Sequence, residues 1–138
     1  MLKILSKIMQ SNGIAFYIIK FIILRLDVLC RFKISFLVAM NVTVRPHYLY
    51  CFYHAGSLAK ALGYNAFSVI EFGVAGGKGL LFLEQYAPRI SKELDIKVEI
   101  FGFDLGDGLN SPYDYRDLPY WFNAGYYKMD QLKLQKKL

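Results

Sequence analysis

The chain has 138 residues, of which 55% are hydrophobic and 17% aromatic, so it is long enough and apolar enough for a single folded domain. This composition excludes disorder over most of its length. The net charge of +6 comes from the first third, because residues 1–46 hold seven basic residues and one acid, whereas residues 47–138 hold ten of each sign. A nucleic-acid-binding surface would spread its basic residues further, so we expect no nucleic-acid partner.

Residues 14–29, with the sequence IAFYIIKFIILRLDVL, form an almost wholly apolar segment that is interrupted by Lys20, Arg25 and Asp27. A charge at the centre of a membrane-spanning helix costs about 2.5–3.5 kcal/mol, so we predict no spanning helix. We also predict no cleavable signal peptide, because Lys20 splits the apolar core and no small-x-small cleavage site follows closely. The charges instead leave a narrow polar stripe on an apolar helix. This pattern favours packing on another domain or subunit, and its alternative is peripheral contact of residues 1–40 with an anionic membrane surface.

A helix over residues 46–62 is predicted next, because Pro46 suits the first turn of a helix and Gly63 suits the position after its end. This start divides the chain into a basic, apolar helical extension, residues 1–45, and a second domain, residues 46–138. We expect a cytoplasmic protein, in which any membrane association takes place through the extension.

His47, Cys51 and His54 are spaced to share one face of that helix. Three such side chains can contact one metal ion, but a structural site needs a fourth ligand, so we predict no metal site and partly exposed histidines. The two cysteines of the chain are Cys30 and Cys51, and we expect both to be buried thiols in a reducing cytosol. The alternative, a disulfide between them, would require export.

Two short apolar runs flank a glycine-rich segment and predict a strand, a helix and a second strand in succession. Residues 66–72, AFSVIEF, read as a buried parallel strand, residues 80–92 as a helix, and residues 97–103, KVEIFGF, as a strand that ends at Asp104. Such a unit brings the glycine loop and the acid to the same edge of the sheet, where backbone N–H groups can contact a ligand. The arrangement predicts a ligand that contains adenosine.

The spacing of the glycines distinguishes three kinds of nucleotide-binding loop. A phosphate-binding loop requires Ser or Thr after Gly-Lys, but Lys78 is followed by Gly79. A dinucleotide-binding loop requires G-x-G-x-x-G, and both possible frames in this segment lack the third glycine. The remaining pattern is an acid followed by glycine or alanine at every second position, and it is met by Glu71, Gly73, Ala75 and Gly77.

This motif, within VIEFGVAGGKGLL and followed by IFGFDLGDGLN, resembles the macrocin O-methyltransferase-like group of the class I S-adenosylmethionine-dependent methyltransferases. The resemblance covers residues 69–109 by motif, and it implies an α/β fold in which a Rossmann-like βαβ unit is preceded by N-terminal helices. It also implies S-adenosyl-L-methionine as the cofactor and O-methylation of a small molecule, such as a sugar. The alternative is a non-catalytic membrane-surface or interaction protein that retains a degenerate nucleotide-binding fold.

The resemblance also implies roles for individual residues. Glu71 would hold the ammonium group of the methionine part, and Asp104 would accept the ribose hydroxyls, with Asp107 as a less direct contact. Other interpretations stay open, in which Glu71 caps the following helix and Asp104 is an ordinary turn acid. The backbone would line the cofactor at Gly73, Val74, Ala75 and Gly77.

Little sequence follows Asp104, and it predicts no further strand, whereas methyltransferases of this class have a seven-stranded sheet. We therefore expect a truncated domain, or one whose missing half comes from another chain or from an oligomer. No catalytic residue can be assigned. The aromatic segment Ser111 to Tyr127, with Asp114 and Asp117, is the remaining candidate for substrate contact, although the sequence favours a helix and turn that close the hydrophobic face of the unit.

Overall fold

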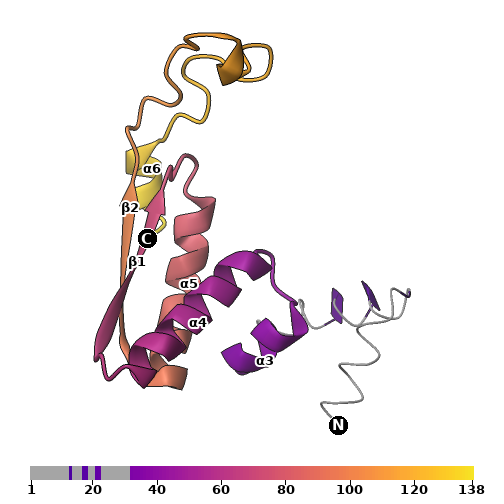
Figure 1. The fold of residues 1–138 in the computed structure, drawn as a ribbon, viewed down its shortest axis with the longest axis vertical. Coiled ribbons are helices and arrows are strands. Elements are labelled where there is room, and N and C mark those ends of the chain that lie inside the picture. The colour runs from indigo at the N-terminus through magenta and orange to yellow at the C-terminus, as the bar shows by residue number, and fades with distance from the viewer. Residues whose placement is uncertain (1–12, 14–16, 19–20, 23–31) are drawn as a thin grey trace.

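The computed structural model describes residues 13, 17–18, 21–22 and 32–138, and it shows a mixed α/β chain with a parallel two-stranded sheet (Figure 1). The helix predicted from residue 46 and both predicted strands are confirmed, and the helix between the strands is longer at both ends than predicted. The elements are α3 (Ile34–Met40), α4 (Pro46–Ala61), β1 (Ala66–Phe72), α5 (Lys78–Leu94), β2 (Lys97–Phe103), the 3-10 helix η1 (Tyr115–Asp117) and α6 (Gln131–Gln135).

β1 and β2 pair in parallel over their whole lengths, from Ala66 opposite Lys97 to Phe72 opposite Phe103. Parallel neighbours need a crossover connection, and α5 provides it. Both strands therefore end at the same edge of the sheet, where the rings of Phe72 and Phe103 stack with their centroids 5.6 Å apart. The glycine loop and Asp104 follow directly from these two strand ends, as the sequence predicts.

Only one face of the sheet is covered by the described elements, because α4 and α5 lie on the same side of it (Figure 1). Side chains alternate along β1, so Phe67 and Val69 pack against the helices while Ile70 and Phe72 lie on the other face. The side chain of Ile70 is 51% exposed and that of Phe72 is 79% exposed. The prediction of a buried strand is therefore wrong for one of the two faces of β1.

The hydrophobic core lies between the helices and the covered face of the sheet, and α3 contributes to it. The carboxylate of Glu93 in α5 accepts hydrogen bonds from the N–H groups of Ile34 at 2.6 Å and Ser35 at 3.0 Å, so it satisfies two donors in the first turn of α3. Part of the predicted extension, residues 1–45, thus shares a core with the second domain. The buried core residues are Ile34, Leu37, Met40, Val42, Leu49, Phe52, Phe82, Leu83, Tyr86 and Ile90.

Most of the N-terminal segment lies outside the described residues, including Lys20, Arg25, Asp27 and Cys30. The membrane-surface helix and its alternative, packing on another domain or subunit, therefore remain predictions. In the part of the chain that the structure describes, no helix is both long enough and apolar enough to cross a bilayer.

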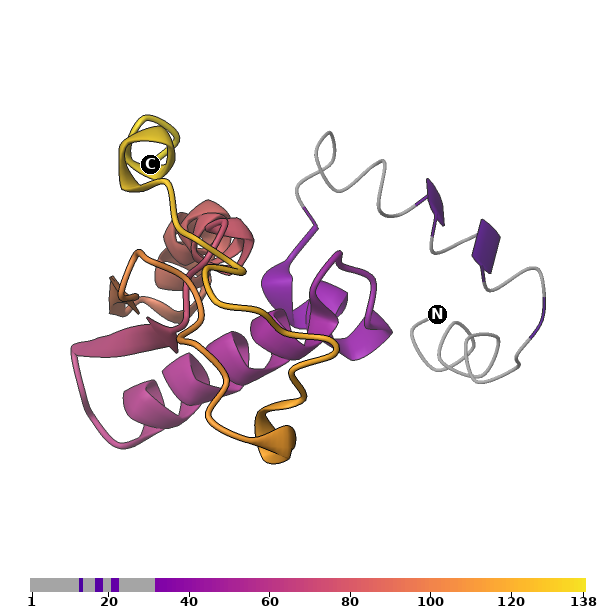
Figure 2. The same ribbon diagram turned by 90° about the horizontal axis from the view of Figure 1, so that it is seen from above.

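After β2 the chain forms an arm, residues 105–130, that extends beyond the edge of the sheet and returns to α6 (Figure 1, Figure 2). Three backbone hydrogen bonds close its base: the N–H of Met129 donates to Gly106 at 3.1 Å, that of Leu109 to Tyr126 at 2.8 Å and that of Gly125 to Leu109 at 2.8 Å. Aromatic side chains of the arm are exposed, to 92% in the case of Tyr113. The prediction that this segment closes the hydrophobic face of the unit is therefore wrong, because the arm projects away from the sheet.

Candidate cofactor site

The glycine loop between β1 and α5 turns through left-handed backbone conformations. Gly73 has a φ of 80° and Gly77 a φ of 75°, values that side chains with a Cβ rarely adopt. Ala75 lies between them with a φ of 46°, which costs a residue with a Cβ roughly 1–2 kcal/mol. The backbone therefore favours glycine at residues 73 and 77, as the sequence predicts. Ala75 also has a positive φ, so its backbone is strained.

The loop is also held from outside by α6. A Cβ at Gly77 would collide with Leu134, and Leu134 packs with Val74 and Leu80 in a second, smaller apolar cluster. The side chain of Val74 is buried there, and neither Val74 nor Gly77 lines the open pocket at this edge of the sheet, whereas Gly73 and Ala75 do. No sequence signal marks this contact, because α6 is short and reaches the loop only through tertiary packing.

Asp104 links the end of β2 to the glycine loop. Its Oδ2 accepts a hydrogen bond from the N–H of Ala75 at 2.8 Å, and its Oδ1 accepts one from the N–H of Gly106 at 2.7 Å. The hydrogen bond from Ala75, followed by that from Gly106, holds the pKa of the Asp104 carboxyl below its ordinary value, so the group is ionised at neutral pH. An ionised carboxylate has roughly four acceptor sites, and the two backbone donors leave some of them for a ligand.

An open pocket of about 730 Å³ lies at this edge of the sheet. Its volume is within the range of roughly 300–1,000 Å³ that is typical of small-molecule sites. Asp107 is exposed and does not line the pocket, whereas Gly108 and Tyr127, which the motif did not include, do line it. The lining residues are Phe72, Gly73, Ala75, Phe103, Asp104, Leu105, Gly108, Leu109 and Tyr127.

Glu71 lies on the helical face of β1 and contacts α4 and α5. Its Oε1 accepts a hydrogen bond from the hydroxyl of Tyr48 in α4 at 2.8 Å. Its Oε2 is enclosed and has no hydrogen-bond partner among the residues that the structure describes. The carboxylate lies against Gly79 in the first turn of α5, where a Cβ would collide with it. Tyr48 and Gly79 are thus parts of the site that the motif did not include.

Glu71 and Asp104 line different pockets. Glu71 lines a second pocket of about 510 Å³, between α4 and the edge of β1 that faces away from β2. Phe72 lines both pockets. The structure thus brings Asp104 together with the glycine loop but places the Glu71 carboxylate on the other side of Phe72. The alternation of side chains does not indicate this separation, because Glu71 has the parity of Val69 and Asp104 that of Ile100, and both Val69 and Ile100 face the helices.

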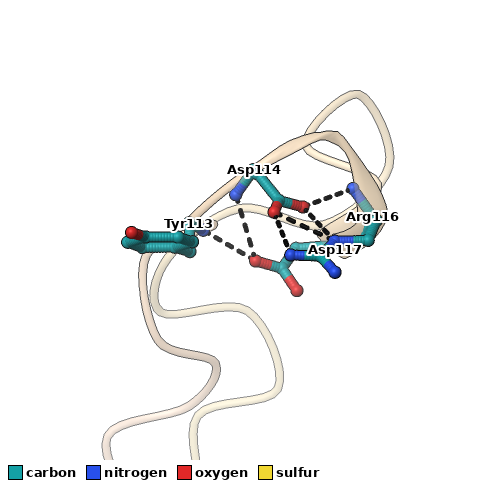
Figure 3. A network of polar contacts seen from close by, with 4 residues as sticks. All are labelled: Tyr113, Asp114, Arg116 and Asp117. Carbon is teal, nitrogen blue, oxygen red and sulfur yellow. Dashed lines mark hydrogen bonds and ion pairs between the residues drawn. The ribbon is translucent and has the colours of Figure 1, made fainter.

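Two acids of the arm, Asp114 and Asp117, hold its tip together (Figure 3). Asp114 accepts a hydrogen bond from the backbone N–H of Arg116 at 2.8 Å and forms an ion pair with its guanidinium at 2.5 Å. Asp117 accepts a hydrogen bond from the N–H of Tyr113 at 2.7 Å. The Arg116 side chain holds the pKa of the Asp114 carboxyl below its ordinary value. Neither acid lines the pocket at the sheet edge, so the structure does not place them as substrate contacts there.

His47, Cys51 and His54 do not form a metal centre, since the described ranges contain no group of three or more His, Cys, Asp or Glu side chains placed to hold an ion. Both imidazoles are exposed, and the ring of His54 lies 4.3 Å from that of Tyr50 between centroids. Cys51 is a free and exposed thiol. The predicted burial of this thiol is wrong, because Cys51 lines the second pocket and not the core.

No protein-family model, curated protein or solved structure matches this chain. The features of the molecule that bear on its function are the glycine loop, the acids Glu71 and Asp104, and the two pockets that these acids line.

Proposed function

We propose that this chain is an S-adenosylmethionine-dependent methyltransferase domain, built on a Rossmann-like unit, that methylates a hydroxyl group of a small molecule such as a sugar. The observation that carries the proposal is the 2.8 Å hydrogen bond between Oδ2 of Asp104 and the N–H of Ala75. It sets a strand-end carboxylate directly beside a glycine loop in an open pocket. A ribose diol is recognised by this kind of arrangement, with backbone on one side and an ionised acceptor on the other.

The residues present suit both polar ends of such a cofactor. Asp104 would accept hydrogen bonds from the ribose hydroxyls, and Asp107, which does not line the pocket, would be a less direct contact. At the other end, Oε2 of Glu71 has no donor among the described residues, and the ammonium group of the methionine part would provide one. The bound cofactor would supply an electrophilic methyl group on its sulfonium. The backbone would line the cofactor at Gly73, Val74, Ala75 and Gly77.

A cofactor that reaches both acids would extend past Phe72, which lines both pockets. This geometry agrees with a ligand that has two polar ends joined by an apolar middle, because the ring of Phe72 provides apolar surface to both pockets.

We further propose that additional strands complete the sheet in the working enzyme. Within the described residues each strand has a neighbour on one side only, and the free N–H and C=O groups of such an edge favour pairing with another strand. The strands would come from a second copy of this chain or from another chain, and the residues that bind the acceptor would come with them.

The open face of the sheet supports a second function of a different class. Ile70, Phe72, Phe101 and Phe103 lie on this face, and each is roughly half exposed or more. Exposed apolar patches of this kind are typical of interaction surfaces. The alternative is therefore a non-catalytic interaction or membrane-surface protein that retains a degenerate nucleotide-binding fold, and such a protein would not bind the cofactor.

Isothermal titration calorimetry with S-adenosylhomocysteine separates the two functions. We expect the wild-type chain to bind this ligand and Asp104→Asn to bind it at least about tenfold more weakly, because a hydrogen bond to a charged group contributes about 1.5–3 kcal/mol. No heat of binding at high protein concentration, or equal affinity in Asp104→Asn, would contradict the methyltransferase proposal.

Asp95→Asn is the matched control for this experiment. Asp95 lies at the far end of α5 with a φ of 52°, a conformation that asparagine tolerates, so this variant should bind like the wild type. Thermal unfolding of both variants is needed as well, since Asp104 also holds the N–H of Ala75. If Asp104→Asn unfolds like the wild type but binds the ligand more weakly, the result supports direct contact of Asp104 with the ligand.

A further inference from the structure

Tyr48 and Glu71 form a side-chain pair that connects α4 to β1. The hydroxyl of Tyr48 donates to Oε1 of Glu71 at 2.8 Å. The Tyr48 ring is held on two sides, by Phe82 in an edge-on contact with 6.2 Å between centroids and by the Arg45 guanidinium at 5.1 Å from the ring centre. The hydrogen bond to Glu71, together with burial and the charge of the same carboxylate, raises the pKa of Tyr48. Its hydroxyl is therefore a protonated donor at neutral pH.

This pair leaves one oxygen of the Glu71 carboxylate without a donor. Oε2 is enclosed and has no hydrogen-bond partner in the part of the chain that the structure describes. An enclosed acceptor without a hydrogen bond is unfavourable, and more so when it belongs to a charged group. Gly79 makes this placement possible, because any Cβ at that position would collide with the carboxylate. A cationic group of a ligand that entered from the second pocket, which Glu71 lines, and displaced the side chains that enclose Oε2 would give this oxygen a donor.

We propose that Tyr48 is a positioning residue for the amino-acid end of the cofactor: by holding Oε1, it fixes the Glu71 carboxylate in the orientation that leaves Oε2 for the ligand's ammonium group. This inference rests on the proposed function. Tyr48 acts through Glu71 and does not itself contact the ligand. Without the hydroxyl of Tyr48, Glu71 loses this donor, and its carboxylate is free to rotate out of the orientation that keeps Oε2 for the ammonium group.

A comparison of two ligands isolates this role. S-adenosylhomocysteine carries the ammonium group, whereas 5′-methylthioadenosine has the same nucleoside and a thioether but no amino-acid end. For Tyr48→Phe we expect about tenfold weaker binding of S-adenosylhomocysteine and unchanged binding of 5′-methylthioadenosine, both measured by calorimetry at neutral pH. In the Glu71→Gln background, Tyr48→Phe should cause no further loss, because its effect passes through the Glu71 carboxylate.

Tyr50→Phe is the matched control, since Tyr50 lies on the same helix and its exposed ring contacts His54. A loss for S-adenosylhomocysteine alone in Tyr48→Phe, with wild-type binding of both ligands in Tyr50→Phe, supports the inference. Unchanged binding of S-adenosylhomocysteine in Tyr48→Phe overturns it, and so does an equal loss for both ligands, which a general structural role would cause. If the wild type binds neither ligand, the proposed function itself fails, and the inference fails with it.

Discussion

Ala75 is a residue whose side chain does not suit its backbone conformation. Its φ of 46° is left-handed, and the two loop positions with the same requirement, Gly73 and Gly77, are glycines. Alanine loses roughly 1–2 kcal/mol in this conformation, whereas the greater freedom of glycine in the unfolded chain costs about 0.5–1 kcal/mol. We therefore expect Ala75→Gly to raise the free energy of unfolding by up to about 1 kcal/mol, as measured by urea denaturation.

Ala55→Gly provides the comparison for this prediction. Ala55 is an exposed residue in the middle of α4, where the backbone is helical and glycine is less stable than alanine by about 1 kcal/mol. The two substitutions should thus change the free energy of unfolding in opposite directions. A loss of stability in both variants would show that the backbone of Ala75 is not strained.

The position of Asp104 can be predicted from the sequence, whereas the surroundings of Glu71 cannot. Asp104 ends the second strand of a parallel unit, and the topology of such a unit places both strand ends beside the glycine loop. Glu71 also precedes the loop, but its partner Tyr48 comes from α4. That contact depends on how α4 crosses the sheet, and no local spacing of residues encodes this crossing.

At the scale of elements, α3 depends on a side chain from another helix. Burial by itself raises the pKa of Glu93, but the hydrogen bonds from Ser35 and Ile34 outweigh it and hold the pKa below its ordinary value. Glu93 therefore caps α3 as an ionised carboxylate. We expect Glu93→Gln to lower the free energy of unfolding at pH 7 by about 0.5–2 kcal/mol, the range for loss of a helix cap, as measured by thermal or urea unfolding.

The pH dependence of this effect is a test of the charge. Because the pKa of Glu93 is lower in the folded than in the unfolded chain, its contribution is complete above the unfolded value near 4.5 and is lost as the pH falls through the folded value. The difference between the wild type and Glu93→Gln should shrink accordingly. Glu84→Gln, at an exposed position of the same helix, is the matched control for the change of a carboxylate to an amide. A difference that stays constant down to low pH would argue against an ionised cap.

The elements differ in how well the sequence predicts them. Pro46 and Gly63 mark the two ends of α4, and β1 and β2 are short apolar runs, so the local sequence pattern is sufficient to predict these three elements. The sequence also predicts helices before residue 46, but it does not indicate that α3 joins the core. The seven residues of α3, ISFLVAM, show no polar stripe that would orient the helix, and their fixed position comes from Glu93 and from packing with distant residues.

At the scale of the whole molecule, the open face of the sheet should determine how the chain associates. Phe72 and Phe103 are mostly exposed and stack on each other on this face, at the edge where both strands end. We expect the wild type to self-associate at high concentration and the double variant Phe72→Ser, Phe103→Ser to do so much less, as measured by sedimentation velocity. The free energy of unfolding should change little, because both side chains are already largely in water.

Tyr120→Ser distinguishes this face from exposed aromatic surface in general. Tyr120 is 94% exposed on the arm, away from the sheet, so its replacement should leave the association unchanged. A wild type that sediments as a monomer at every concentration, or an equal effect of Tyr120→Ser, would exclude the open face as the associating surface.

The contact between Leu134 and Gly77 imposes an order on the assembly of the candidate site. During synthesis β1, α5 and β2 are produced in succession, so the parallel pair can form as soon as residue 103 is available. The glycine loop meets its last neighbour only after α6 has been produced and the arm has closed at its base. The edge that would receive the ligand is therefore the last part of the described fold to be completed, and the length of the arm sets the delay.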